Sequence, residues 1–333
     1  MKKLALLLTC SALALAVPVR AHHSAAAFDT QKNVAVTGTV VSYRYTNPHI
    51  YLTLEVKKDD GSTQRMEVEA GAASVLTPLG FTKDSLKIGE LVTVSGNPSR
   101  REPDKLMLGK DLTRKDGSYL PLNIASKSVF DTKNATATSI AGTWFSPMSQ
   151  FGGYMGAAGR WPKTDQARAA AKLGPKETTQ KDCIPIGVPA VMFYPVANTI
   201  TVEKDKVVMK VDWMDSTRTV YLDGRKHPPA SETSLHGHSV GRWEGKTLIV
   251  ETTNFKEHPM GLSTSVPSST QKKVTEKLEL SADGKQLLYS GTVEDPVFLA
   301  QPGTWSGTWE YRPNMPQSDQ QCDVELARKF LAN

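Results

Sequence analysis

The sequence predicts a mainly β protein with two barrels in tandem, a five-stranded one followed by a larger antiparallel one. Residues 34–113 and 199–311 contain many short stretches in which apolar and polar side chains alternate, as in half-buried strands. Turn residues separate these stretches at short intervals, which is typical of all-β architectures. The 333-residue chain also exceeds the usual length of a single domain, so it can bury two separate cores.

Residues 1–21 have the organisation of a secretory leader. The segment begins with two lysines, continues with an apolar run over residues 4–17, and ends with the small residues Val19 and Ala21 before the expected cleavage point. The apolar run is too short for a permanent membrane span, and no later stretch reaches the ~18 apolar residues of one. We therefore expect a cleaved leader, export to the periplasm and no stable membrane span.

Charge excludes one class of partner. The chain carries 40 basic and 34 acidic side chains, and removing the three basic residues of the leader leaves 37 against 34, a net charge of +3. This excess is mild, and no basic stripe with interleaved aromatic residues is visible, so we expect no nucleic-acid partner. A small molecule or a metal ion is the expected partner, and the oligomeric state is left open.

Two cysteines lie beyond the leader, Cys183 and Cys322. An even pair in an exported protein predicts one disulfide. This disulfide would tie the turn-rich segment 183–189 to a helix expected at about residues 323–331. A redox or metal-binding pair is the alternative, but no Cys-x-x-Cys spacing supports it.

The first half reads as a small barrel with one helix. A strand over residues 34–45 is expected to bend at Gly38, and a short helix over residues 72–79 to end at Gly80. The other expected strands are residues 49–56, 63–69, 91–95 and 105–113. Three strands, a helix and two strands follow the order of an OB-fold barrel. We therefore divide the chain into a leader (1–21), an OB-like domain (22–120), a linker (121–139) and a second barrel domain (140–333).

Four motifs in the first half point to a known group of proteins. They are Ala21-His22-His23-Ser24, Phe28-Asp29, Thr46-Asn47-Pro48-His49 and the glycine-bounded stretch from Gly89 to Gly96. Over about residues 21–115 the chain resembles a widespread family of uncharacterised exported bacterial proteins with a small OB-like periplasmic domain. The resemblance implies the domain and the compartment, and it implies no activity.

Cleavage before His22 would create a possible metal site. The new α-amine and the imidazole of His22 can chelate one ion, and His23 or His49 would add a further imidazole. Such a set of three nitrogen atoms resembles the histidine brace of periplasmic copper proteins and oxidative copper enzymes. Nitrogen donors in tetragonal geometry favour Cu²⁺, so copper is the cofactor considered. The alternative is an inert terminus, with His49 bonded to its own turn.

The second half reads as an antiparallel meander. Residues 121–139, rich in Ser, Thr, Asn and Ala, are expected to form the linker, and Gly142-Thr143-Trp144 resembles the first strand of lipocalin-type barrels. Eight strands are expected at residues 199–203, 206–213, 217–222, 239–243, 247–253, 271–280, 287–293 and 305–311. Residues 151–159 are expected to be irregular and residues 162–173 helical. A meander needs no helical crossover, so we expect a closed or nearly closed antiparallel, lipocalin-like barrel and no parallel sheet.

The densest polar motifs of the chain lie in this second half, at residues 221–228, 236–245 and 294–296. The set resembles a second domain of many uncharacterised exported bacterial proteins, and again the resemblance implies no reaction. In a structural interpretation, Arg218, Arg225 and Arg242 pair with carboxylates at the barrel rim, while Asp223 and Glu244 form turns.

A functional interpretation of the same motifs remains open in two forms. As a binding cavity, the second barrel would have Trp243 and Trp305 as walls. Its polar anchors would be Arg225, His238 and Asp295. As an enzyme, it would use His238 as a general base oriented by Glu244 or Asp295, or hold zinc between His236 and His238.

The sequence therefore favours a periplasmic protein that binds a small ligand or a metal, with copper at His22 as one form of it. An enzyme is the first alternative, either through copper-dependent oxidation at His22 or through acid/base chemistry around His238. A structural adaptor in a cell-envelope complex is the second.

Overall fold

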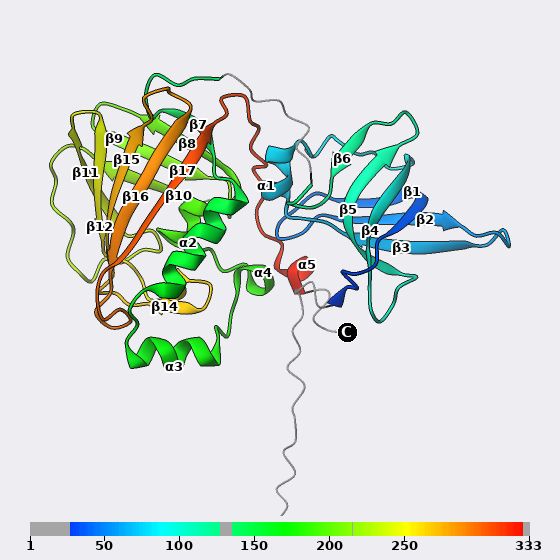
Figure 1. The fold of residues 1–333 in the computed structure, drawn as a ribbon, viewed down its shortest axis with the longest axis horizontal. Helices are drawn as coiled ribbons and strands as arrows, with labels where there is room; N and C mark the ends of the chain where they lie inside the picture. Colours follow the sequence, from blue (N-terminus) through cyan, green and yellow to red (C-terminus); the bar gives the residue numbers. More distant parts are fainter. Residues whose placement is uncertain (1–26, 127–134, 215, 329–333) are drawn as a thin grey trace, which may run out of the picture.

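The computed structural model describes residues 27–126, 135–214 and 216–328, which form two barrels with a few short helices (Figure 1). The expected leader lies outside the described residues, as do His22 and His23. Within the described part of the chain, no helix is both long and apolar enough to cross a membrane.

The first barrel has the predicted strand order. Its strands are β1 (Val34–Arg44), β2 (Tyr51–Lys57), β3 (Thr63–Glu69), β4 (Leu91–Pro98), β5 (Leu106–Arg114) and β6 (Tyr119–Pro121). They are ordered β3-β2-β1-β4-β5-β6, and a parallel pairing of β3 with β5 closes the five-stranded barrel. The helical turns α1 (Ala73–Leu76) and η2 (Thr77–Leu79) lie between β3 and β4 and end at Gly80 in the left-handed conformation, so the short predicted helix is confirmed.

Strand β1 packs closely against β2 at Gly38. A Cβ atom there would lie 2.9 Å from the carbonyl oxygen of Glu55 on β2. The register between β1 and β2 shifts just beyond this point, between Val40 and Ser42. The missing side chain thus permits the curvature that closing a five-stranded barrel requires. Inside, apolar side chains from all five strands form one core that includes Val40, Leu54, Val68, Val94 and Leu112.

The second barrel is closed by nine strands. They are β7 (Gly142–Phe145), β8 (Ala197–Val202), β9 (Lys206–Val211), β10 (Ser216–Tyr221), β11 (His238–Glu244), β12 (Thr247–Thr253), β15 (Lys273–Leu280), β16 (Gln286–Glu294) and β17 (Gly303–Tyr311). Their order around the barrel follows the chain, with β17 paired to β7. All eight strands expected after residue 198 are present, and β7 is the ninth.

The second barrel is antiparallel as expected, except at one junction. Strands β10 and β11 are parallel, with Val220 opposite Ser239 and Tyr221 opposite Val240. The physical reason is the strand number, because an odd number of strands cannot alternate in direction around a closed ring. The connection over residues 222–237 brings the chain back along the barrel, and it contains nearly all of the polar motif at residues 221–228 and the start of the one at 236–245.

Helix α2 (Met148–Arg160) corrects the expectation of an irregular segment at residues 151–159. Its four glycines each cost about 0.5–1 kcal/mol relative to alanine in a helix, so local propensity argues against it. Tertiary packing compensates, since Tyr154 is 1% exposed and its hydroxyl donates to the carbonyl of Leu262 at 2.8 Å. The predicted helix before Gly174 is confirmed as α3 (Asp165–Leu173), with Thr164 as its N-cap.

The remaining elements are short. They are α4 (Thr179–Asp182), η3 (Ala190–Phe193), the hairpin strands β13 (His258–Ser263) and β14 (Val266–Ser268), and α5 (Val324–Arg328). The disulfide between Cys183 and Cys322 is present as predicted and joins the segment after α4 to the one before α5.

Buried Asn47 joins the two barrels. Its Nδ2 donates to the carbonyl of Gln320 at 2.9 Å, and its Oδ1 accepts from the backbone N and Oγ of Ser74. Its carbonyl accepts from the amide of Asp323, next to the disulfide-bonded Cys322. The C-terminal segment therefore packs against both barrels, beside α1 in Figure 1.

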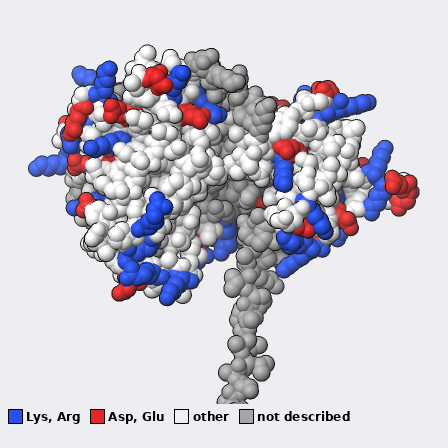
Figure 2. All heavy atoms as spheres, in the orientation of Figure 1, with Lys and Arg blue, Asp and Glu red and all other residues white. Residues whose placement is uncertain are grey.

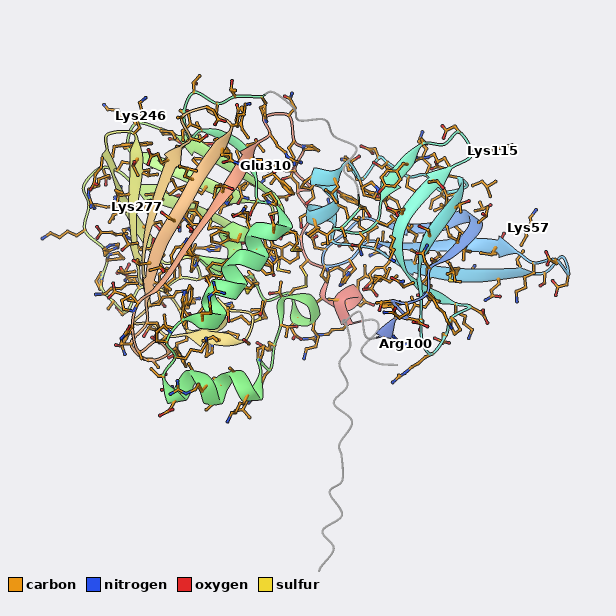
Figure 3. All side chains as sticks on the ribbon, viewed as in Figure 1. Lys57, Arg100, Lys115, Lys246, Lys277 and Glu310 are labelled. Atoms are coloured by element: carbon orange, nitrogen blue, oxygen red, sulfur yellow. A yellow bond between two sulfur atoms is a disulfide. The ribbon has the colours of Figure 1, made fainter. Side chains whose placement is uncertain are left out.

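Charged side chains are distributed without a dominant sign over most of the face drawn in Figure 2, where basic and acidic residues are interspersed. The outer face of the second barrel carries exposed lysines such as Lys246 and Lys277 (Figure 3). Charge patterning on this face therefore indicates no single docking surface, and the interior of the second barrel is the more informative region.

Candidate functional site

Strand alternation sets which side chains of the second barrel face inward. On β15, Val274, Glu276 and Leu278 are buried, whereas Lys277 is exposed. Glu276 pairs with Val250 on β12 and with Gly291 on β16, so these positions share the inner face. The same alternation places Arg218 of β10 and Tyr289 of β16 inside.

A hydrogen-bonded charge pair lies inside this barrel. Arg218 Nη2 is 2.7 Å from Glu276 Oε2, and the Tyr289 hydroxyl donates to Glu276 Oε1 at 2.6 Å. Arg218 is 6% exposed, and Glu276 and Tyr289 are fully buried. Burial, followed by the negative charge of Glu276, raises the pKa of Tyr289, so the phenol keeps its proton and acts as a donor. Both charges are thereby removed from water, which is costly unless each is well paired.

Several donors near this pair have no acceptor. Among the described residues, Nε and Nη1 of Arg218 and the indole nitrogens of Trp305 and Trp309 are buried without a hydrogen-bond partner. The same holds for the Trp213 indole nitrogen, Asn198 Oδ1 and Ser216 Oγ. Each unsatisfied buried group costs about 1–3 kcal/mol, and most buried polar groups in proteins are satisfied. The set is therefore a candidate site for polar contacts to a bound molecule or to water inside the barrel.

Aromatic rings cover the inner face beside these donors. Tyr154 of α2 stacks on Phe193 of η3 with ring centroids 4.8 Å apart, and Phe193 lies 5.2 Å from Tyr289. Tyr289 in turn lies 6.1 Å from Trp305 and 5.2 Å from Trp309. The interior thus combines an aromatic surface with a small number of fixed polar groups, as small-molecule sites do.

Two further basic side chains lie near Arg218. Lys272 is 2% exposed, its Nζ donates to the carbonyls of Val188 and Gly261, and burial lowers its pKa to about 7. Burial lowers the pKa of His236 to about 4, and the charges of Arg218 and Lys272 add to this effect. His236 is therefore neutral at pH 7.

Lys272 makes the stability of the protein depend on pH. Its pKa is lower in the folded chain than in the unfolded chain, so between pH 7 and 10.5 the unfolded state binds more protons and the free energy of unfolding rises with pH. Relative to Lys272→Met, the wild-type protein should gain about 2 kcal/mol between pH 7 and pH 9, measured by urea unfolding. Lys277→Met, on the exposed face of the strand β15 that begins after Lys272, is the control. Parallel pH curves for wild type and Lys272→Met would contradict the shift.

His238 and Arg225 lie on the outer face of the barrel, not inside it. Ser239 is buried and inward-facing, so its neighbour His238 points outward and stacks on Tyr221 with centroids 5.3 Å apart. The Arg225 guanidinium lies 3.7 Å from the Tyr221 ring centre. Burial, His227 and Arg225 lower the pKa of His238, while Asp223 acts in the opposite direction.

The structure does not bring the other two proposed catalytic groups to His238. Glu244 lies at the opposite end of β11 and accepts from Arg242 Nε at 3.0 Å. Asp295 is 1% exposed and accepts from the backbone N and Oγ of Ser269 and from the amide of Val297. Both carboxylates are thus engaged in local structure.

The two proposed cavity walls are also separated. Trp305 is buried on the inner face of β17, whereas Trp243 is 42% exposed near the end of β11. The structural interpretation of the arginines fits better, because Arg225 pairs with Asp223 and Arg242 with Glu244. Arg218 is also paired with a carboxylate, but inside the barrel rather than at its rim.

The expected metal ligands are only partly described. His49 Nδ1 lies 3.1 Å from the carbonyl of Ala70 and 3.4 Å from Glu69 Oε1. His22 and His23 lie outside the described residues. Within residues 27–126, 135–214 and 216–328, no group of three or more His, Cys, Asp or Glu side chains is placed to hold a metal ion.

Sequence reasoning missed the central residues of this site. Glu276 and Tyr289 were counted only as parts of strands, and Arg218 was assigned to the rim. The sequence does contain a sign of this site. Glu276 occupies a position between Val274 and Leu278 where the alternation of the strand calls for an apolar residue. A charged residue at such a position is either an edge feature or a buried functional group.

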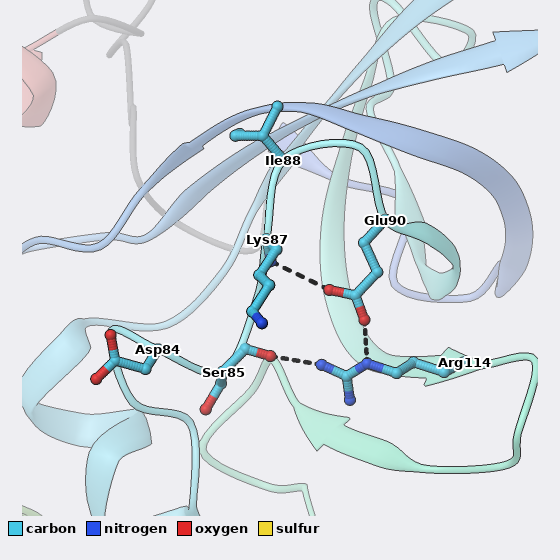
Figure 4. A pocket seen from close by; sticks show the side chains of 6 residues that line it. All are labelled: Asp84, Ser85, Lys87, Ile88, Glu90 and Arg114. Atoms are coloured by element: carbon cyan, nitrogen blue, oxygen red, sulfur yellow. Dashed lines mark hydrogen bonds and ion pairs between the residues drawn. The ribbon is translucent and has the colours of Figure 1, made fainter.

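A pocket in the first barrel is lined by Asp84, Ser85, Lys87, Ile88, Glu90 and Arg114, with a volume of about 470 Å³ (Figure 4). Its polar groups bond to one another. Glu90 accepts from the amide of Lys87 and from Arg114 Nε, and Arg114 also donates to the carbonyl of Ser85. These bonds engage the polar groups in holding the loop before β4. The pocket is therefore a weaker candidate for a ligand site than the barrel interior.

Comparison with known proteins gives two matches. Residues 11–105 match the model of a family of unknown function (DUF6152), which does not extend to the second barrel. No curated protein matches the chain. Among solved structures, the chain is similar to a mutant of the fluorescent protein UnaG, with 13% identity, a TM-score of 0.25 and coverage of 52% of this chain and 96% of that chain.

Proposed function

We propose that the protein binds a small, largely apolar molecule with a carboxylate or carbonyl group inside the second barrel. The observation that carries this proposal is Arg218, a buried guanidinium with two nitrogens, Nε and Nη1, that have no partner among the described residues. Glu276 already balances its charge, so the open groups act as hydrogen-bond donors. An oxygen acceptor of a bound molecule would satisfy them.

The composition of the interior supports this class of ligand. The unpartnered indoles of Trp305 and Trp309 add donors, whereas Asn198 Oδ1 supplies an acceptor. The rings of Tyr154, Phe193 and Tyr289 would contact an apolar body. A ligand with several acceptors and few donors therefore fits better than a polyol or a cation.

Export to the periplasm is part of the proposal. The leader pattern of residues 1–21 and the Cys183–Cys322 disulfide support an oxidising compartment. Copper binding by His22, His23 and His49 stays a prediction from the sequence. The contacts of His49 with Ala70 and Glu69 do not favour this metal site over a ligand site inside the second barrel.

Intrinsic fluorescence tests the proposal on the full chain. All six tryptophans, from Trp144 to Trp309, lie in the second barrel and its helices, so the first barrel contributes no indole signal. Naphthoate and octanoate are the probes, each compared with its alcohol analogue. We expect a saturable change for at least one acid, with affinity at least about tenfold weaker in Arg218→Met, because a hydrogen bond to a charged group contributes about 1.5–3 kcal/mol.

Two controls make this result interpretable. Arg242→Met removes an exposed arginine and should leave binding unchanged. Trp305→Phe removes one unpartnered donor and keeps an aromatic ring, so it tests the site even if Arg218→Met folds poorly. Equal binding by wild type, Arg218→Met and Trp305→Phe would contradict the proposal, as would the absence of any saturable signal together with no co-purifying molecule in native mass spectrometry.

A further inference from the structure

Two imidazoles face each other on the outside of the second barrel. His227 Nδ1 and His238 Nδ1 are 3.0 Å apart, and the two rings lie at 78° to one another. Both side chains are partly exposed, so small solutes can reach them. This pair is separate from the barrel interior, because His238 projects from the outer face of β11.

Both rings are held in place by their surroundings. His238 begins β11, pairs with Thr253 on β12 and stacks on Tyr221. His227 precedes two prolines whose carbonyl oxygens accept hydrogen bonds from Asn254 Nδ2, at 3.3 Å and 2.9 Å. A metal ion would therefore meet two imidazoles that have already lost most of their conformational freedom, which lowers the cost of binding.

The distance between the two nitrogens selects a type of metal. With metal–nitrogen bonds of about 2.0–2.1 Å, a nitrogen–nitrogen distance of 3.0 Å subtends roughly 90–97° at the ion. This is the angle between neighbouring positions in square-planar or octahedral coordination, whereas a tetrahedral angle of about 109° would require about 3.3–3.4 Å. Ions that prefer tetragonal nitrogen coordination are Cu²⁺ and Ni²⁺.

The geometry points to a second metal site of this protein, in which His227 and His238 chelate Cu²⁺ or Ni²⁺ through their Nδ1 atoms and water fills the remaining positions. Arg225 is the nearest cation that would oppose it, but its guanidinium is hydrogen-bonded to both carboxylate oxygens of Asp223. The site requires neither the amino-terminal histidines nor the interior of the barrel.

Metal titration of the full chain tests the inference. The background is His22→Ala/His23→Ala, so that the amino terminus cannot compete. Calorimetry with CuCl₂, NiCl₂ and ZnCl₂ should show one equivalent of Cu²⁺ bound more tightly than Zn²⁺. Electron paramagnetic resonance of the copper form should show coupling to two nitrogens. His227→Ala and His238→Ala should each weaken copper binding at least tenfold, and exposed Lys226→Ala should not.

Three outcomes would overturn the site. Unchanged copper affinity in both histidine variants would place the ion elsewhere. Binding of Zn²⁺ as tight as Cu²⁺ would contradict the angle argument, and no copper binding at micromolar protein concentration would show that the pair is only a hydrogen bond. His227 lies in a partly exposed loop, so the variant His227→Ala should fold. It therefore still tests the site if His238→Ala fails to fold.

Discussion

Replacing Cys183 and Cys322 with serine should lower the free energy of unfolding by up to about 5 kcal/mol. The disulfide joins residues 139 apart in the sequence, and in the chain-entropy model a closed loop of this length restricts the unfolded chain by about that amount. Urea unfolding of the oxidised wild-type protein and the double variant, followed by far-UV circular dichroism for both barrels and by tryptophan fluorescence for the second barrel alone, measures the difference.

The location of the disulfide adds a second expectation to the same experiment. Cys322 lies next to Asp323, whose amide donates to the carbonyl of Asn47 in the first barrel. Loss of the bond should therefore loosen the contact between the barrels, and unfolding should change from one transition to two. Wild type treated with reductant is the control and should reproduce the variant. A difference below about 1 kcal/mol would mean that the C-terminal segment is held without the bond.

Glu276→Gln should lower the free energy of unfolding by about 3–5 kcal/mol, the usual cost of leaving a buried charge without its partner. The variant keeps the shape of the side chain but removes the negative charge that Arg218 faces at 2.7 Å. The Tyr289 hydroxyl keeps an acceptor, so the loss reports on the charge pair.

The matched control for this variant is Glu251→Gln. Glu251 pairs with Arg242 on the exposed face of the same barrel, where an ion pair contributes about 0–1 kcal/mol. The double variant Arg218→Met/Glu276→Leu should recover much of the loss, because a buried ion pair can be replaced by apolar side chains of similar volume. Equal effects of Glu276→Gln and Glu251→Gln would show that Arg218 has another counter-charge.

The sequence predicts the strands of this protein well because each strand leaves a local trace, an alternation with turns at its ends. It does not predict how many strands close the second ring. The parallel contact of β10 with β11 depends on how many strands complete the ring, and four residues at β7 decide that number. Helix α2 was missed for the opposite reason, since its glycines oppose a helix locally and its buried Tyr154 favours one only through tertiary contacts.

The candidate site was predicted less well because alternation does not reveal which face of a strand points inward. His238, Arg225 and Asp223 belong to a dense polar motif in the sequence. His238 lies one position before inward-facing Ser239 on β11, so its side chain points outward. Arg218 and Glu276 are far apart in the sequence, and the barrel brings them together. Their pairing could be predicted only by recognising a charged residue at an apolar position on each of two strands.

The junction between β10 and β11 has a kinetic consequence. In the described strands, these two pair only at Val220–Ser239 and Tyr221–Val240, whereas β16 and β17 pair along almost their entire length. The contact between β17 and β7 is equally short, with Glu310 opposite Phe145 and Tyr311 opposite Trp144, so amide protons should exchange fastest at these two junctions of the wall. At the β10–β11 junction, such local opening would lie two residues along the chain from inward-facing Arg218, while the rest of the barrel stays folded.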